Sequence, residues 1–78
     1  MPIARTPAQR FVICLQNEGY EASLERRKIY VRVDDRAAAR DGMVRVIDES
    51  GESYLYPATW FATVVLPPRV GKAVARQR

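Results

Sequence analysis

The sequence predicts a small all-β domain in which five short antiparallel strands close into a barrel. Its apolar residues gather in short runs rich in Val, Ile and Tyr, the residue types that favour strands. Turn residues separate these runs, and helix-like periodicity is confined to short stretches. A barrel would also remove the unpaired edges that such apolar strands otherwise expose.

The first predicted strand is the continuous apolar run at residues 11–15, which is closed by an Asn/Gly turn signal. Polar and acidic side chains dominate residues 18–27, where we expect a long loop with Tyr20 and Leu24 as its inward-facing anchors. The second predicted strand covers residues 28–33. Its inward face would carry Ile29, Val31 and Val33, and its outward face Lys28, Tyr30 and Arg32.

Residues 34–42 connect the second strand to the third. An aspartate N-cap and a stop at Gly42 would permit one helical turn over residues 37–40, but so short a stretch cannot hold a helix by itself. We therefore expect a structured loop. The clearest hairpin of the chain comes next, with a strand at 43–47, a tight turn at 48–51 and a returning strand at 52–56 that Pro57 ends.

One 3₁₀ turn is predicted at residues 58–61, and a fifth strand at residues 63–66 stops at two prolines. The predicted barrel domain thus spans residues 10–67. An irregular lead-in over residues 1–9 precedes it, and a flexible basic tail with a weak helical pattern follows over residues 68–78.

The formal charge of +4 at pH 7 is carried by the two ends of the 78-residue chain. The first ten residues hold two bases and no acid, the last ten hold four bases and no acid, and the segment between them holds seven bases and nine acids. This distribution favours solvated termini, with phosphate attraction through the tails as the alternative. Five bases of the predicted sheet region would either form a basic stripe or be neutralised by interleaved acids, which we favour: Arg26, Arg27, Lys28, Arg32 and Arg45.

The composition also limits the chemistry. The chain has no histidine and one cysteine, which excludes the usual zinc and iron sites and histidine-dependent acid–base catalysis. We expect an inert buried thiol at Cys14, no cofactor and no enzymatic activity. A lone cysteine favours a reducing cytoplasm. We expect no secretory signal and no membrane partner, because no apolar run approaches the length of a bilayer span.

Three segments in this order resemble an SH3 domain. Residues 11–15 resemble the opening strand of that family, residues 22–27 its diverging turn after an acidic loop, and residues 54–61 its segment that leads through a proline into the 3₁₀ turn. The resemblance covers about residues 10–66. The stretch at 48–57 also resembles one found in small uncharacterised bacterial proteins of SH3-like type, which implies a bacterial host and a fold but no activity.

SH3 domains bind proline-rich peptides between aromatic ridges, and the resemblance carries only part of that groove to this chain. Pro57 and Trp60 stand at two ridge positions. Other positions have lost the family residue: Gln16 and Glu18 stand in place of tyrosines, Met43 in place of a tryptophan, and Arg27 in place of the glycine of the diverging turn. The resemblance therefore implies an SH3-like fold whose ligand differs from a proline-rich peptide.

We expect a non-catalytic binding module that takes a peptide or protein partner, and the acidic loop favours a basic one. The candidate partner-binding residues are Trp60, Pro57, Met43, Gln16, Glu18, Glu21 and Tyr56. Trp60 would act as the anchor, unless it is a core residue beneath the 3₁₀ turn. The alternative is an accessory nucleic-acid binder that uses Arg69, Lys72, Arg76 and Arg78. A weaker third possibility is an oligomer that buries a face formed by Tyr30, Tyr54 and Tyr56.

Overall fold

The computed structural model describes residues 10–76 of the chain. Its strands are β1 (Phe11–Cys14), β2 (Ile29–Val33), β3 (Met43–Ile47), β4 (Ser53–Pro57) and β5 (Phe61–Val64). Its helical segments are α1 (Arg36–Arg40), the 3₁₀ turn η2 (Ala58–Trp60) and α2 (Pro68–Arg76). The predicted all-β class is confirmed in its coarse form, because strands dominate and the helices are short.

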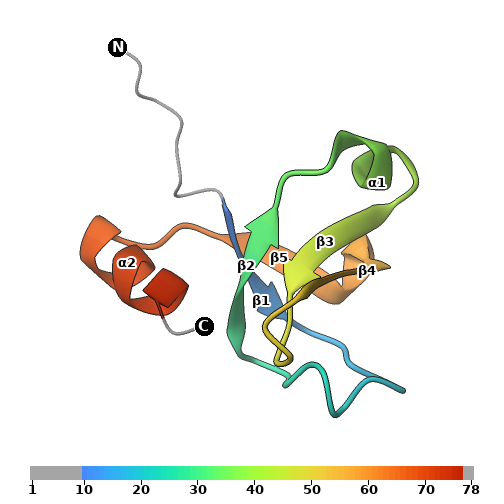
Figure 1. The fold of residues 1–78 in the computed structure, drawn as a ribbon, viewed down its shortest axis with the longest axis horizontal. Coiled ribbons are helices and arrows are strands. Elements are labelled where there is room, and N and C mark those ends of the chain that lie inside the picture. The colour runs from blue at the N-terminus through green and yellow to red at the C-terminus, as the bar shows by residue number, and fades with distance from the viewer. Residues whose placement is uncertain (1–9, 77–78) are drawn as a thin grey trace.

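The five strands form one antiparallel sheet in the order β4-β3-β2-β1-β5 (Figure 1). Each of the three hydrogen-bonded pairs β1–β2, β2–β3 and β3–β4 joins neighbours in the sequence, and β5 returns to pair with β1. β4 and β5 are the edge strands. The sheet does not close through backbone pairing, so the barrel stays a prediction.

The main core lies on one face of the sheet, under the loop that joins β1 to β2. Its buried members are Val12, Cys14, Leu24, Tyr30, Val46 and Tyr56, with Val44, Trp60 and Phe61 packed against them. Leu24 is the inward anchor expected of the loop, and the burial expected for the Cys14 thiol is confirmed.

The predicted orientation of β2 was wrong. Tyr30 is only 5% exposed, whereas it was expected on the outward face. Its hydroxyl donates to a Glu49 carboxylate oxygen at 2.6 Å and accepts from the Glu25 N–H at 2.7 Å. Because both hydrogen-bonding roles of the phenol are satisfied, its ring can be buried without leaving the polar tip unpaired.

A short helix replaces the loop expected between β2 and β3. Asp35 is the N-cap residue of α1, and its carboxylate accepts from the Ala38 N–H at 3.0 Å. The same carboxylate accepts from the Arg45 side chain on β3 at 2.8 Å. Ala38 is buried against the sheet. These tertiary contacts supply the stability that five residues of helix propensity lack.

The basic segment after β5 is also a helix, where a flexible tail was expected. α2 lies at one end of the molecule beside β2, and α1 and the β3–β4 hairpin lie toward the other end (Figure 1). The helix approaches the sheet closely at Gly71, where a Cβ atom would come within 3.1 Å of the Phe11 ring. Neither α1 nor α2 within residues 10–76 has the length and hydropathy to cross a membrane.

Candidate functional site: an aromatic cluster beside an acidic loop

Three aromatic side chains meet next to η2, one from the loop after β1 and two from the continuous β4–η2 segment. We call Tyr20, Tyr56 and Trp60 the aromatic cluster. The Tyr20 ring meets the edges of Tyr56 and Trp60 at centroid distances of 5.5 Å and 5.7 Å, and Tyr56 stacks with Trp60 at 6.4 Å. These separations are those of favourable aromatic pairs, so the three rings support one another.

Tyr56 is the fixed base of the cluster. Its side chain is 3% exposed, and its hydroxyl donates to the Asp48 carboxylate at 2.6 Å. Asp48 also accepts from the hydroxyl and the N–H of Ser50, at 2.6 Å and 2.9 Å. Burial and the hydrogen bond to Asp48 raise the pKa of Tyr56 to about 12. The ring therefore stays neutral and in place at physiological pH.

Asp48 is ionised although it is the one charged residue in the described chain that is buried. Burial by itself raises the pKa of this carboxyl, but the hydrogen bonds from Ser50 and Tyr56 outweigh that effect and hold the pKa below its ordinary value. The tight turn between β3 and β4 is thus tied to the base of the aromatic cluster.

Two backbone hydrogen bonds position η2 and Trp60, one to the residue before β3 and one from the residue after β1. η2 starts after Pro57, and the Ala58 N–H donates to the Gly42 carbonyl at 2.9 Å. The Trp60 carbonyl accepts from the Leu15 N–H at 2.7 Å. The indole is half-buried. It packs against the main core and keeps part of its surface accessible to solvent.

The loop from residue 15 to residue 28 carries the third ring. Tyr20 donates its N–H to the Asn17 carbonyl at 2.7 Å, and the Asn17 side chain donates to the Leu24 carbonyl at 3.0 Å. Ser23 accepts from the Glu49 N–H at 2.9 Å, which ties the loop to the β3–β4 turn. Tyr20 remains 51% exposed on this well-anchored loop.

The predicted partner-binding residues lie on the segments that flank the cluster, which are β3, β4, η2 and the loop after β1. Met43 and Pro57 are paired in register on β3 and β4, and both are half-buried. Gln16 directly follows the residue that bonds to the Trp60 backbone. Tyr56 was predicted to contact the partner, but its ring is buried and packs against Tyr20 and Trp60. Glu18 and Glu21 are exposed on the same loop as Tyr20.

Tyr20 is the residue that the sequence analysis did not include in the site. It was expected to be an inward anchor of the loop, whereas half of its surface is accessible. An aromatic side chain between Glu18 and Glu21 was the available signal, because a solvated acidic loop has no structural need of one. Its partners lie more than thirty residues away in sequence, so local patterning could not identify them.

The expected neutralisation of the sheet's bases is confirmed for three of them. Their ion pairs are Lys28–Glu49 at 2.7 Å, Arg32–Asp34 at 3.0 Å and Arg45–Asp35 at 2.8 Å. The predicted face of Tyr30, Tyr54 and Tyr56 does not exist as a surface, because Tyr54 alone is exposed. The sheet therefore offers neither a basic stripe nor a tyrosine face.

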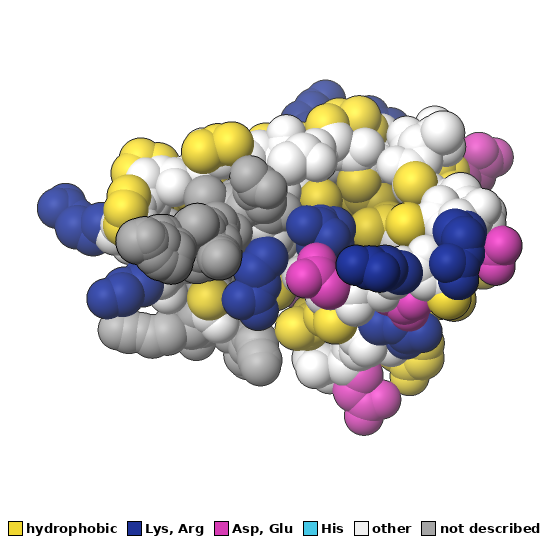
Figure 2. All heavy atoms as spheres, turned by 90° about the horizontal axis from the view of Figure 1, so that it is seen from above, with side chains coloured by type: hydrophobic (Ala, Val, Ile, Leu, Met, Phe, Trp, Pro, Cys, Tyr) yellow, Lys and Arg dark blue, Asp and Glu magenta, His cyan; other side chains and the backbone are white. Residues whose placement is uncertain are grey.

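The candidate nucleic-acid residues lie at the opposite end of the molecule. Arg69 and Lys72 are exposed on α2, Arg76 is its last residue, and Arg78 lies outside the described residues. On the face in Figure 2, acidic and basic side chains are interleaved on the strand side, and the end that carries α2 displays basic and apolar side chains. The structure thus separates the two candidate sites.

The reactive groups of the described chain are few. Burial raises the pKa of the Cys14 thiol, which donates to the Gln16 carbonyl at 3.2 Å. Within residues 10–76 no cluster of three or more metal-ligating side chains is present. What the aromatic cluster can do is hold an apolar or cationic group against its accessible ring faces.

Comparison of the chain with protein-family models, with curated proteins and with solved structures found no significant match in any of the three.

Proposed function

We propose that this chain is a non-catalytic SH3-like binding module that holds a peptide or protein partner at the aromatic cluster. The observation that carries the proposal is that Tyr20, from the loop after β1, meets Tyr56 and Trp60 of the continuous β4–η2 segment. A half-buried tryptophan held by neighbouring rings loses little conformational entropy when a partner covers it. Such residues commonly supply most of the binding energy in an interface.

The arrangement also favours a particular kind of partner. Glu18 and Glu21 are exposed beside Tyr20, and electron-rich ring faces attract cations. Carboxylates beside aromatic faces therefore favour a peptide with lysine or arginine next to an apolar residue. The strand order, in which β5 returns to β1, supports the SH3-like part of the proposal.

A peptide-display selection against the full chain tests the function. We expect enrichment of basic peptides with an apolar or aromatic residue. We expect the substitution Trp60→Ala to weaken the best peptide by about 30-fold, the loss typical of a residue that dominates an interface. Tyr20→Ala should weaken it as well. Circular dichroism and urea unfolding of both variants would verify that the sheet persists.

Tyr54→Ala is the matched control for Tyr20→Ala. Tyr54 is as exposed as Tyr20 but lies outside the aromatic cluster. Its affinity for the selected peptide should equal that of the native chain. The proposal fails if Trp60→Ala remains folded and binds as tightly as the native protein. It also fails if no peptide is enriched and a lysate partner is lost on nuclease treatment.

A second candidate function is nucleic-acid binding through α2. The helix brings Arg69, Lys72 and Arg76 together within nine residues that contain no acid. Phosphate contacts release counterions, so binding to a DNA or RNA oligonucleotide should weaken steeply between low and moderate salt. Replacing the three bases by glutamine should abolish retention of the oligonucleotide and leave peptide binding unchanged. Unchanged retention would rule this function out.

A further inference from the structure

A second concave surface lies away from the aromatic cluster, between α2 and the sheet. It is a groove of about 770 Å³. Its lining includes Phe11, Val31 and Leu66, together with the two bases Arg10 and Lys72. This volume is in the range of pockets that hold small-molecule ligands. The register puts Phe11 opposite Val31, on the face that alternates with Val12 and Tyr30. The groove is therefore on the other side of the sheet from the main core.

The floor of the groove is formed by close packing. Phe11 is buried, and a Cβ atom added at Gly71 of α2 would come within 3.1 Å of its ring. A larger residue at position 71 would fill this space. The helix therefore leaves an open apolar channel beside itself, and the exposed Val65, which is 72% accessible, lies at its margin.

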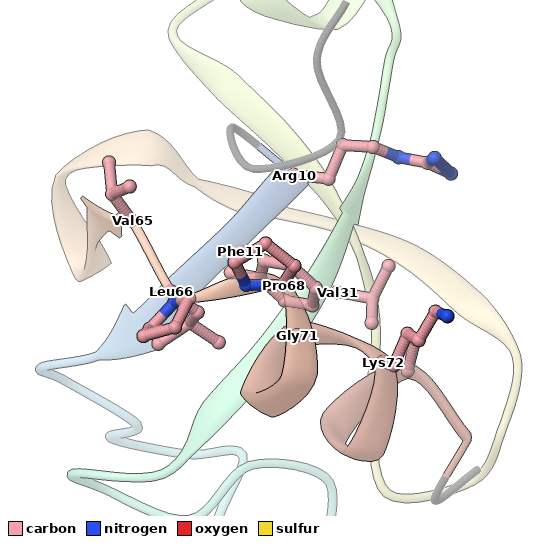
Figure 3. Close-up of a pocket in the computed structure, with 10 residues that line it drawn as sticks. Arg10, Phe11, Val31, Val65, Leu66, Pro68, Gly71 and Lys72 are labelled. Atoms are coloured by element: carbon pink, nitrogen blue, oxygen red, sulfur yellow. The ribbon is translucent and has the colours of Figure 1, made fainter.

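The groove has an apolar end and a cationic side. In Figure 3, Arg10 and Lys72 extend toward one side of the groove, and Val65 and Leu66 lie toward the other. Among the described residues that line the groove, none is acidic. Within the part of the chain that the structure describes, the ion pairs involve Lys28, Arg32 and Arg45, and none involves Arg10 or Lys72.

We propose that this groove binds a single-chain amphiphile with an anionic head, such as a medium-chain carboxylate. The hydrocarbon chain lies along Phe11, Val31 and Leu66, where its burial removes apolar surface from water. The carboxylate head lies at the side where Arg10 and Lys72 supply positive charge. This inference is independent of the function proposed for the aromatic cluster.

Charge also argues against a second copy of the chain as the occupant. In a two-fold symmetric contact the same patch meets itself. Such a contact would bring Arg10 and Lys72 of both copies together without a carboxylate from the groove to neutralise them. An anionic ligand instead pairs with both cations, so the charge of the groove favours the ligand.

Titration with dodecanoate, monitored through methyl resonances in NMR spectra of the full chain, tests the proposal. We expect the Val31, Val65 and Leu66 signals to shift and the Val46 signal in the main core to stay unchanged. Dodecanol, which has the same chain and no charge, should bind more weakly. Arg10→Gln and Lys72→Gln should each weaken dodecanoate about two- to fivefold, as expected for an exposed charge pair. Neither should alter dodecanol binding.

A pair of helix variants provides the sharper test. Ala75→Glu puts a carboxylate into the groove lining, and Ala73→Glu puts the same charge at an exposed position of the same helix outside the lining. We expect Ala75→Glu to abolish dodecanoate binding and Ala73→Glu to retain it. Arg69→Gln, which removes a base outside the lining, should also have no effect.

Several results would overturn the inference. Equal binding of dodecanol and dodecanoate, unaffected by Arg10→Gln and Lys72→Gln, would mean that no anion is recognised. Groove signals that depend on protein concentration without ligand would identify a second copy as the occupant. Groove signals that dodecanoate does not move would mean that the groove takes no such ligand, including the case in which another part of the chain fills it.

Discussion

At the scale of single residues, Arg27 is the clearest departure from ordinary backbone geometry. It has a φ of 70°, and the other positive φ angles in the described chain belong to glycines. The left-handed region costs a residue with a Cβ atom about 1–2 kcal/mol, and glycine avoids this cost. The resemblance to SH3 domains assigned a glycine to this position, so the local backbone agrees with the diverging turn although the residue does not.

We therefore expect Arg27→Gly to stabilise the fold. The relief of the left-handed strain exceeds the extra entropy of glycine in the unfolded chain, which leaves a gain of about 0.5–1 kcal/mol in the free energy of unfolding. Urea unfolding measures it. Arg26→Gly is the control, because Arg26 is also exposed but has no positive φ, and it should destabilise. A loss of stability in Arg27→Gly would contradict the argument.

Tyr56→Phe isolates the contribution of one hydrogen bond. The variant keeps the ring that supports Tyr20 and Trp60 but removes the hydroxyl that donates to Asp48 at 2.6 Å. A hydrogen bond to a charged group contributes about 1.5–3 kcal/mol, so we expect a loss of that size in unfolding experiments. Partner binding should persist in the folded variant.

Tyr54→Phe serves as the comparison for this variant. The Tyr54 hydroxyl donates to the exposed Glu52 carboxylate at a longer distance of 3.3 Å. We expect no change in stability, since both groups can bond to water instead. Equal losses in the two variants would show that the buried carboxylate has no special dependence on Tyr56.

Among the helices and strands, those defined by local signals were predicted well, and those that depend on contacts distant in sequence were not. The hairpin of β3 and β4 was predicted to within one residue at each boundary, because alternation and a Gly-containing turn are local signals. β5 begins at Phe61, two residues earlier than expected, because Phe61 pairs with Cys14 across the sheet. That pairing is not visible in the local pattern.

The errors on β2 and α2 have one common physical cause. Alternation divides β2 into two faces but does not tell which face is covered, and here each face has a cover. Tyr30 faces the main core, and Val31 faces α2. α2 itself was missed because the helical pattern of the basic segment is short and weak by itself. The close approach of α2 to the Phe11 ring at Gly71 is a tertiary contact that no local pattern reveals.

The contact between α2 and the sheet at Gly71 can be tested by substitution. Gly71→Leu should separate α2 from the sheet, because even a Cβ atom at this position approaches the Phe11 ring within 3.1 Å. We expect a loss of about 1–3 kcal/mol, the usual cost of overpacking, and faster amide hydrogen exchange throughout α2. Ala73→Leu, at an exposed position of the same helix, should retain slow exchange. Unchanged exchange in Gly71→Leu would mean that the helix does not depend on this contact.

At the scale of the whole molecule, the aromatic cluster shows why only part of the site could be predicted. Trp60 and Pro57 follow from a contiguous segment with a family resemblance. Tyr20 joins them through a loop whose position depends on hydrogen bonds to the β3–β4 turn. The proposed binding surface of this small sheet thus depends on contacts that only the complete fold creates.

The carboxylates that organise this fold predict its response to acid. The hydrogen bonds that Asp48 and Glu49 accept hold both pKa values below the ordinary values of 3.8 and 4.5. A lowered native pKa stabilises the fold above the unfolded value and loses that contribution as the pH falls. Unfolding free energies should thus be steady above about pH 5 and decline below about pH 4. The Asp48→Asn variant should be less stable than the native chain at pH 7, and its unfolding free energy should fall less as the pH is lowered.

The buried tyrosines predict a loss of stability at high pH, in contrast to the loss at low pH that the carboxylates cause. Burial and the bond to Asp48 raise the pKa of Tyr56 to about 12, and burial and the bond to Glu49 raise that of Tyr30. A raised native pKa stabilises the fold below the unfolded value of 10.0 and loses this contribution as the pH approaches the native value. The difference in unfolding free energy between the native chain and Tyr56→Phe should therefore be constant up to about pH 9 and shrink between pH 10 and 12. A constant difference across that interval would mean that the phenol ionises no less readily in the folded chain than in the unfolded one.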